Sequence, residues 1–160
     1  MNEQTAGAAP RGIYGLVSMR MIRLFVMLRK SGILAQRRQF GLSETEWRIM
    51  TQLGEAAPLS LNGLADAMLQ DRGQLSRAVK SMVERDLLTR ARKPGGPEIE
   101  IDLSDRGRTI YAGMVDWVYE RDRALTEGMA REDIDTVWRV LTEMMGRAQG
   151  MLDEELRLEG

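Results

Sequence analysis

Apolar residues recur at intervals of three and four along most of this sequence, and this periodicity predicts a mainly helical fold. The pattern begins at Ile13 and predicts one long helix over about 13–38, after a polar, aperiodic and flexible tail at 1–12. Further helices are predicted over about 43–53, 60–68, 71–86, 104–125 and 128–156, with a turn at 54–58. The two long helices at the end have apolar stripes that need a second surface to cover them.

The helical period gives way to strict alternation between residues 89 and 103. Apolar Ile99, Ile101 and Leu103 alternate with acidic Glu100 and Asp102, which is typical of a half-buried strand. The two halves of this stretch are separated by the sequence Pro-Gly-Gly-Pro, which favours a tight turn. The sequence therefore predicts a mainly α fold with one small β-hairpin.

Several helix starts carry capping residues. Ser43 stands three residues before Glu46, which is the spacing of a capping box. Ser60, Asp71 and Ser104 each precede an apolar-periodic segment and are predicted N-caps. These caps fix the order of the elements as three helices, a hairpin and a long helix.

The composition limits the chemistry. The 160 residues include no Cys and no His, so thiol catalysis, Ser-His-Asp catalysis and thiolate or imidazole metal sites are excluded. We therefore expect no enzyme, no cofactor and no metal. Arg20 and Arg23 interrupt the N-terminal apolar stretch, so we expect no membrane partner and a cytoplasmic location.

The net charge of −1 conceals a basic centre. Residues 70–97 carry 7 basic and 3 acidic side chains, whereas residues 98–160 carry 8 basic and 16 acidic ones. A local cluster of Lys and Arg is typical of a surface that binds a polyanion, although it is also found on ordinary solvated helix faces.

Six segments together resemble the MarR family of bacterial transcription regulators, and it is their order and spacing that carries the resemblance. Two are the long helices predicted at both ends, which extend the match over 13–156. The other four are LSETEW at 42–47, LADAM at 64–68, LSRAVKSMVERDLL at 75–88 and IDLSDRG at 101–107. The resemblance implies a winged helix-turn-helix lobe over 42–104 within a single domain at 13–160. It also implies that the helices at 13–38 and 108–156 form the interface of a homodimer.

By the same resemblance, the partner is double-stranded DNA and the protein is a regulator, expected to be a repressor acting at pseudo-palindromic operators. The helix at 71–86 would be the recognition helix. Gln and Arg can each form bidentate contacts with base edges, so Gln74 and Arg77 are the expected base contacts. The full predicted DNA-binding set is Ser43, Ser60, Arg72, Gln74, Arg77, Lys80, Ser81, Arg90, Arg92 and Lys93.

The hairpin departs from the family pattern. Its tip has Gly95, Gly96 and Pro97 where the family usually has an arginine that enters the minor groove. We therefore expect this wing to add affinity through phosphate contacts more than sequence readout. The same departure supports an alternative, in which the protein is a winged-helix module that binds another protein and binds DNA weakly or not at all.

The resemblance also implies a small aromatic or phenolic effector. The residues expected to contact it are Tyr14, Phe25, Trp47, Arg48, Met114 and Trp117. The competing interpretation is that these apolar residues are simply core, because Met and aromatic side chains at helical spacing usually are. The basic side chains of the first helix, including Arg20 and Arg23, are expected to attract the acidic last helices across the dimer rather than to bind DNA.

Overall fold

The computed structural model describes residues 12–92 and 95–159. The predicted tail therefore lies outside the described residues except for Gly12, and so do Lys93 and Pro94 of the hairpin. The chain forms two compact units, Met1–Met114 and Val115–Gly160.

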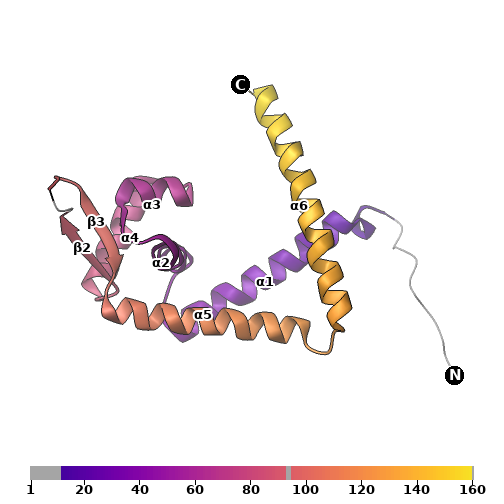
Figure 1. Cartoon of the computed structure of the whole chain (residues 1–160), viewed down its shortest axis with the longest axis horizontal. Helices are drawn as coiled ribbons and strands as arrows, with labels where there is room; N and C mark the ends of the chain where they lie inside the picture. Colours follow the sequence, from indigo (N-terminus) through magenta and orange to yellow (C-terminus); the bar gives the residue numbers. More distant parts are fainter. Residues whose placement is uncertain (1–11, 93–94, 160) are drawn as a thin grey trace. The chain divides into compact units, whose positions relative to one another are not determined.

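The first unit contains four helices, three short strands and the start of a fifth helix (Figure 1). The helices are α1 (Val17–Phe40), α2 (Glu44–Ala56), α3 (Leu61–Met68) and α4 (Arg72–Glu84), and α5 (Asp105–Thr126) begins here. The strands are β1 (Leu59–Ser60), β2 (Leu88–Arg92) and β3 (Ile99–Leu103). This arrangement confirms the predicted mainly α fold with a small β-hairpin.

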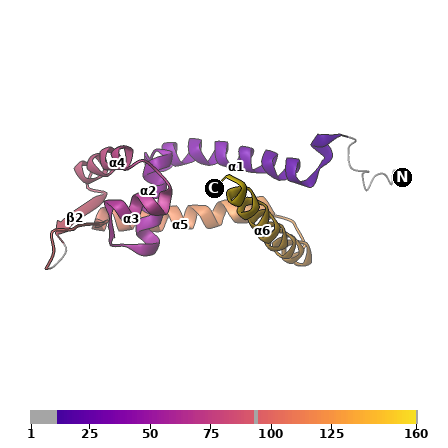
Figure 2. The same cartoon turned by 90° about the horizontal axis from the view of Figure 1, so that it is seen from above.

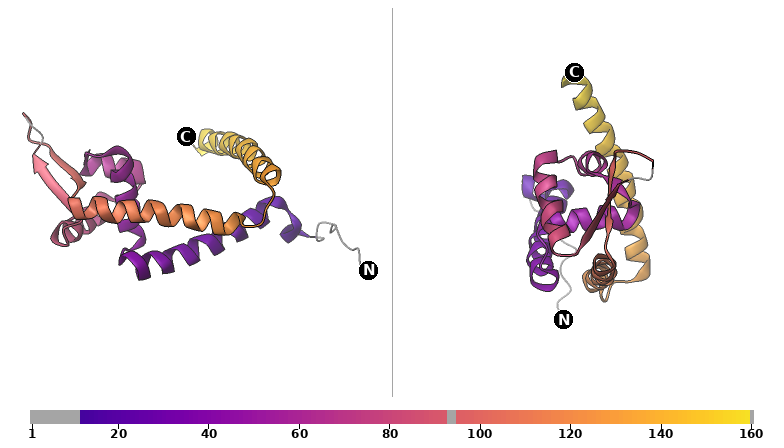
Figure 3. Two further views of the ribbon diagram at one scale, coloured as in Figure 1. Left: turned by 60° about the horizontal axis from the view of Figure 1, so that its bottom comes forward. Right: turned by 90° about the vertical axis from the view of Figure 1, so that its left-hand side faces the viewer.

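Helices α2, α3 and α4 gather beside the base of the hairpin, as Figure 2 shows. Their inner faces and the inner face of β3 enclose one core with completely buried side chains. Its members are Leu42, Ile49, Met50, Leu53, Leu64, Met68, Leu75, Val79, Met82, Leu87, Leu88, Ile101, Leu103 and Met114. Beyond this core, β2 and β3 continue as a two-stranded ribbon, seen on the left in Figure 3.

The predicted caps are confirmed. The Ser43 hydroxyl accepts from the Glu46 amide at 3.3 Å, and the Glu46 carboxylate accepts from the Ser43 amide at 2.8 Å, which completes the capping box. The hydroxyl of Ser60 and the carboxylate of Asp71 cap α3 and α4 in the same way. The Ser104 hydroxyl accepts from the Gly107 amide at 2.9 Å at the start of α5.

Three local expectations were wrong. The first predicted helix is broken, because Ile13–Gly15 form a 3-10 turn and Leu16 has extended backbone before α1 begins. The second continues through Gly54 to Ala56, where a turn was expected. Gly54 is a packing residue and not a turn residue, because a Cβ atom there would collide with the ring of Tyr111. The hairpin also has a third strand, since β1 pairs with β3 through Leu59 and Ser60.

The second unit consists of the end of α5 and helix α6 (Arg131–Glu159). Gly128, with a φ of 78°, lies in the turn between them, where the left-handed conformation favours glycine. No residue of α6 is buried. Its exposed apolar side chains include Val137, Trp138, Leu141, Met145, Met151, Leu152 and Leu156. Among the described residues, no helix is both long and apolar enough to cross a membrane.

Candidate nucleic-acid interface

Helix α4 presents a polar face away from the core. Leu75, Val79 and Met82 are buried, and this inward row holds the helix against α2 and α3. The opposite side carries two rows at helical spacing, one of Gln74, Arg77 and Ser81 and one of Arg72, Ser76 and Lys80. All of these are exposed except Ser81, which is half-buried. We call these two rows the outer face of α4.

The cations of this region are largely unpaired. Within residues 12–92 and 95–159, the side chains of Arg72, Arg77, Arg90 and Arg92 form no hydrogen bond or ion pair. Lys80 Nζ lies 4.0 Å from Glu84 Oε1, and both side chains are mostly exposed. The ion pair is therefore weak and neutralises little of the positive charge of Lys80. The outer face of α4 therefore offers positive charge that the described part of the protein does not neutralise.

Strand β2 brings two more arginines to the hairpin. Leu88 is buried at the start of β2, and the four following residues are exposed. Arg90 pairs with Ile101 and Arg92 with Ile99 across the antiparallel ladder, so the two arginines share one face of the strand. Strand β2 lies at the edge of the sheet because β3 occupies the centre. Lys93, the third basic residue predicted here, lies outside the described residues.

A hollow of about 290 Å³ lies where α3, α4 and the hairpin meet, and we call it the wing hollow. Three residues of the predicted DNA-binding set, Ser60, Arg72 and Arg90, line it together. Their elements are far apart in sequence, so the fold brings these residues to one place. The hollow is also lined by Leu61, Asn62, Pro97, Glu98 and Ile99, so one carboxylate accompanies the two guanidinium groups.

Two of the polar residues on this surface were missed at the sequence level. Asn62 is exposed at the start of α3 and lines the wing hollow, and Ser76 is exposed between Arg72 and Lys80 on α4. A polar side chain two residues after an N-cap was the available signal for Asn62. Ser43, by contrast, belongs to a different corner of the molecule, at the start of α2, where its hydroxyl serves the capping box.

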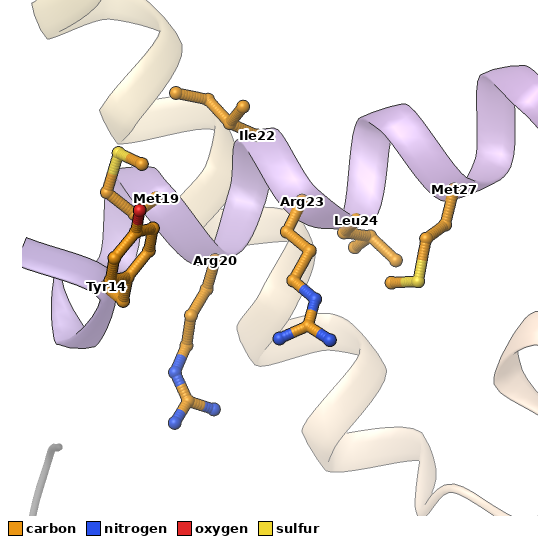
Figure 4. A pocket seen from close by; sticks show the side chains of 7 residues that line it. All are labelled: Tyr14, Met19, Arg20, Ile22, Arg23, Leu24 and Met27. Atoms are coloured by element: carbon orange, nitrogen blue, oxygen red, sulfur yellow. The ribbon is translucent and has the colours of Figure 1, made fainter.

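A second hollow, of about 670 Å³, lies along the N-terminal half of α1 (Figure 4), and we call it the α1 hollow. Its walls are mostly apolar, but the guanidinium groups of Arg20 and Arg23 extend from the same side of the helix. Tyr14 is the member of the predicted effector set that lines it. The lining residues are Tyr14, Met19, Arg20, Ile22, Arg23, Leu24 and Met27.

The other predicted effector residues have separate surroundings. Phe25 lines a further hollow on α1 of about 330 Å³, together with Arg29 and Lys30. The Trp47 ring packs edge-on against Phe40 with centroids 5.6 Å apart. Arg48 donates a hydrogen bond to the Met68 carbonyl at 2.8 Å, and Met114 is part of the core. Trp117 belongs to the second unit, where the guanidinium group of Arg121 lies over its ring.

The geometry defines a winged helix-turn-helix, with α3 and α4 as the two helices and β2–β3 as the wing. Residues 40–96 match the model of the MarR family, which confirms the resemblance predicted from the sequence. No curated protein matches the chain.

Solved structures extend the likeness of fold over most of the chain. A MarR/EmrR family regulator from Acinetobacter sp. ADP1 is 23% identical, with a TM-score of 0.61 over 84% of this chain and 98% of its own. MepR, a transcription regulator of the Staphylococcus aureus multidrug efflux pump MepA, is 15% identical, with a TM-score of 0.75 over 83% of this chain and 98% of its own. A MarR family regulator from Silicibacter pomeroyi is 16% identical, with a TM-score of 0.64 over 91% and 96%. The fold is therefore that of MarR-family transcription regulators.

Proposed function

We propose that this protein is a homodimeric, sequence-specific DNA-binding transcription regulator. The outer face of α4 carries the proposal, because it joins base-reading side chains to unpaired cations on the helix that this fold places in the major groove. Gln74 and Arg77 would contact base edges, and Arg72 and Lys80 would contact the phosphates on either side.

The wing hollow supports the same function. Guanidinium groups of Arg72 and Arg90 and the first turn of α3 surround a space open enough for a phosphate group. Arg92 lies further along the same face of β2 and would follow the DNA backbone. These contacts would position the protein on the duplex, while those of α4 would select its sequence.

The exposed apolar residues of α6 support the homodimer. A helix with this many exposed large apolar side chains needs a partner, because such a surface is costly to leave in water. A second copy of the chain supplies a matching surface. Two recognition helices related by a two-fold axis would then read half-sites about 34 Å apart, so the operator would be a pseudo-palindrome.

The proposal extends to repression and to an effector. A dimer bound across two half-sites covers the duplex and so blocks other proteins from it. The α1 hollow, with apolar walls and two guanidinium groups, suits a small aromatic or phenolic ligand. Release of bound DNA by phenolic acids, compared between the native protein and Arg23→Ala, tests this part of the proposal.

The experiment that tests DNA binding is a fluorescence-anisotropy titration at two salt concentrations. One duplex carries the DNA upstream of the protein's own coding sequence, and the other carries the same bases in scrambled order. We expect tighter binding to the upstream duplex and a steep loss of affinity with salt on both. Equal affinity for the two duplexes would contradict sequence-specific regulation, and no binding to either would favour the protein-interaction alternative.

A further inference from the structure

Arg85 ends the recognition helix and ties it to two other helices. It is the C-cap residue of α4. One side-chain nitrogen, Nη1, donates to Glu46 Oε1 at 2.7 Å in the first turn of α2. The other, Nη2, donates to the carbonyl of Gly41 at 2.9 Å, where α1 ends. The guanidinium group therefore bridges α4 to the corner between α1 and α2.

Glu46 is fully used at this corner. Its Oε1 accepts from Arg85, and its Oε2 accepts from the Ser43 amide at 2.8 Å. The Glu46 side chain is only 12% exposed, whereas that of Arg85 is 40% exposed, so the carboxylate is the sheltered partner of this ion pair. The carboxylate that caps α2 is thus the same one that holds the end of α4.

The end of α4 is also held from the opposite side. Arg106, in the first turn of α5, donates from Nη1 to the carbonyl of Arg85 at 3.3 Å. The Ser104 hydroxyl donates to the Asp86 carbonyl at 2.6 Å. The recognition helix is therefore fixed at its C-terminus by polar contacts with α1, α2 and α5.

Helical spacing alone would have assigned Arg85 to DNA. It follows Ser81 by four residues and so continues the row of Gln74, Arg77 and Ser81. Its guanidinium group, however, is already committed to Glu46 and Gly41, unlike those of Arg72 and Arg77.

We propose that Arg85 is a positioning residue for DNA reading, which acts through its ion pair with Glu46. This proposal rests on the proposed DNA-binding function. The pair sets the orientation in which α4 presents Gln74 and Arg77. Bidentate base contacts demand exact placement, whereas phosphate contacts tolerate small shifts. Loss of the pair therefore weakens the choice of sequence more than the general affinity for DNA.

The test compares the native protein with Arg85→Gln, Glu46→Gln and the double variant on the upstream and scrambled duplexes at several salt concentrations. We expect each single variant to lose about tenfold of the preference for the upstream duplex. The double variant should lose no more than either single one, because both break the same ion pair. The salt dependence on each duplex should not change, because no phosphate contact is lost.

Glu46→Gln is the decisive variant. Glutamine still serves in a capping box, so α2 keeps its cap and the protein folds. Removal of a negative charge by itself strengthens binding to both duplexes. Weaker binding to the upstream duplex, with a loss of preference, is therefore the result that marks a change in the position of α4. Arg29→Gln is the matched control, because it breaks the bidentate Arg29–Glu44 pair at the same corner without touching α4.

Three results would overturn the proposal. The first is that Arg85→Gln weakens binding to both duplexes equally and reduces the slope of log affinity against log salt concentration by about one unit, the amount expected for one lost phosphate contact. Arg85 would then be a DNA contact. If Glu46→Gln kept the native preference, or if Arg29→Gln lost as much of it, the ion pair would have no positioning function. Failure of the native protein to prefer the upstream duplex is a separate result that rejects the proposed function itself.

Discussion

Gly107, in the first turn of α5, lies directly against the carbonyl group of Leu87 at the entrance to β2. A Cβ atom at residue 107 would collide with that oxygen. The carbonyl cannot move away freely, because it also accepts a hydrogen bond from the Ser104 amide at 3.1 Å. This contact joins the end of the helix-turn-helix to the helix that leads out of the first unit.

Gly107→Ala is therefore expected to destabilise the protein strongly, by about 3 kcal/mol or more, because the backbone must shift. Gly113→Ala in the same helix is the control. There the nearest atom to an added Cβ is Phe40 Cε1 at 3.6 Å, an ordinary contact. This second change should be neutral or stabilise by up to about 1 kcal/mol, since alanine favours helix. Urea unfolding of both variants measures the difference, and equal effects would contradict the packing described here.

Tyr111 and Glu55 form a polar contact between α5 and α2, with the phenol donating to the Glu55 carboxylate at 2.8 Å. This hydrogen bond, with burial and the negative charge of Glu55, raises the pKa of Tyr111 above its ordinary value of 10.0. The folded protein thus holds the phenol proton more tightly than the unfolded chain does. The contribution to stability is complete below about pH 10 and is lost as pH rises through the higher folded-state pKa.

Tyr111→Phe should therefore lower the free energy of unfolding by about 1 kcal/mol at pH 8. It should also make that free energy less sensitive to a rise from pH 8 to pH 11 than in the native protein. Urea unfolding at the two pH values gives both quantities. The same loss of stability between pH 8 and pH 11 in variant and native protein would rule out this account of the contact.

Leu69 ends α3 in a left-handed conformation with a φ of 51°, and its side chain is 93% exposed. This conformation is unfavourable for a leucine, and glycine is the usual residue there. Leu69→Gly should raise the free energy of unfolding by about 0.5–1 kcal/mol. Leu69→Ala removes the apolar side chain but keeps the Cβ, so it should change little. Equal stabilisation by both variants would show that exposure rather than backbone strain is the cause.

Trp138 tests the proposed dimer, because it is 71% exposed on the apolar side of α6. Trp138→Glu places a charge in the proposed interface, so analytical ultracentrifugation should detect monomers where the native protein forms dimers. Thr136→Glu adds the same charge two residues away, on a different side of the helix, and should leave the dimer intact. A native protein that sediments as a monomer would contradict the proposal directly.

The local parts of the fold could be predicted from the sequence. Caps such as Ser43 and Asp71 act within one turn, so their signals stand next to the helices that they start. The inward row of α4 was likewise visible as periodicity. Strand β1 could not be predicted, because a strand of two residues is too short to show an alternating pattern. Its pairing with β3 also depends on a segment some 40 residues away.

The parts that could not be predicted depend on contacts between distant residues. Gly54 was interpreted as a turn signal, but its role is set by the Tyr111 ring of another helix. Likewise, the partners of Arg85 are Glu46 and Gly41, which lie 39 and 44 residues away in the sequence. Helical spacing alone groups Arg85 with Ser81 and cannot reveal these contacts. The wing hollow combines Ser60, Arg72 and Arg90 only after folding.

The claim that α4 reads DNA sequence is tested most directly by the duplex preference of Arg77→Ala. The preference is the ratio of affinities for the upstream and scrambled duplexes, measured by fluorescence anisotropy at one salt concentration. Arg139→Ala, which removes an exposed arginine of α6, is the control. We predict that Arg77→Ala loses about tenfold or more of the preference and that Arg139→Ala keeps it. An unchanged preference in Arg77→Ala would contradict the account.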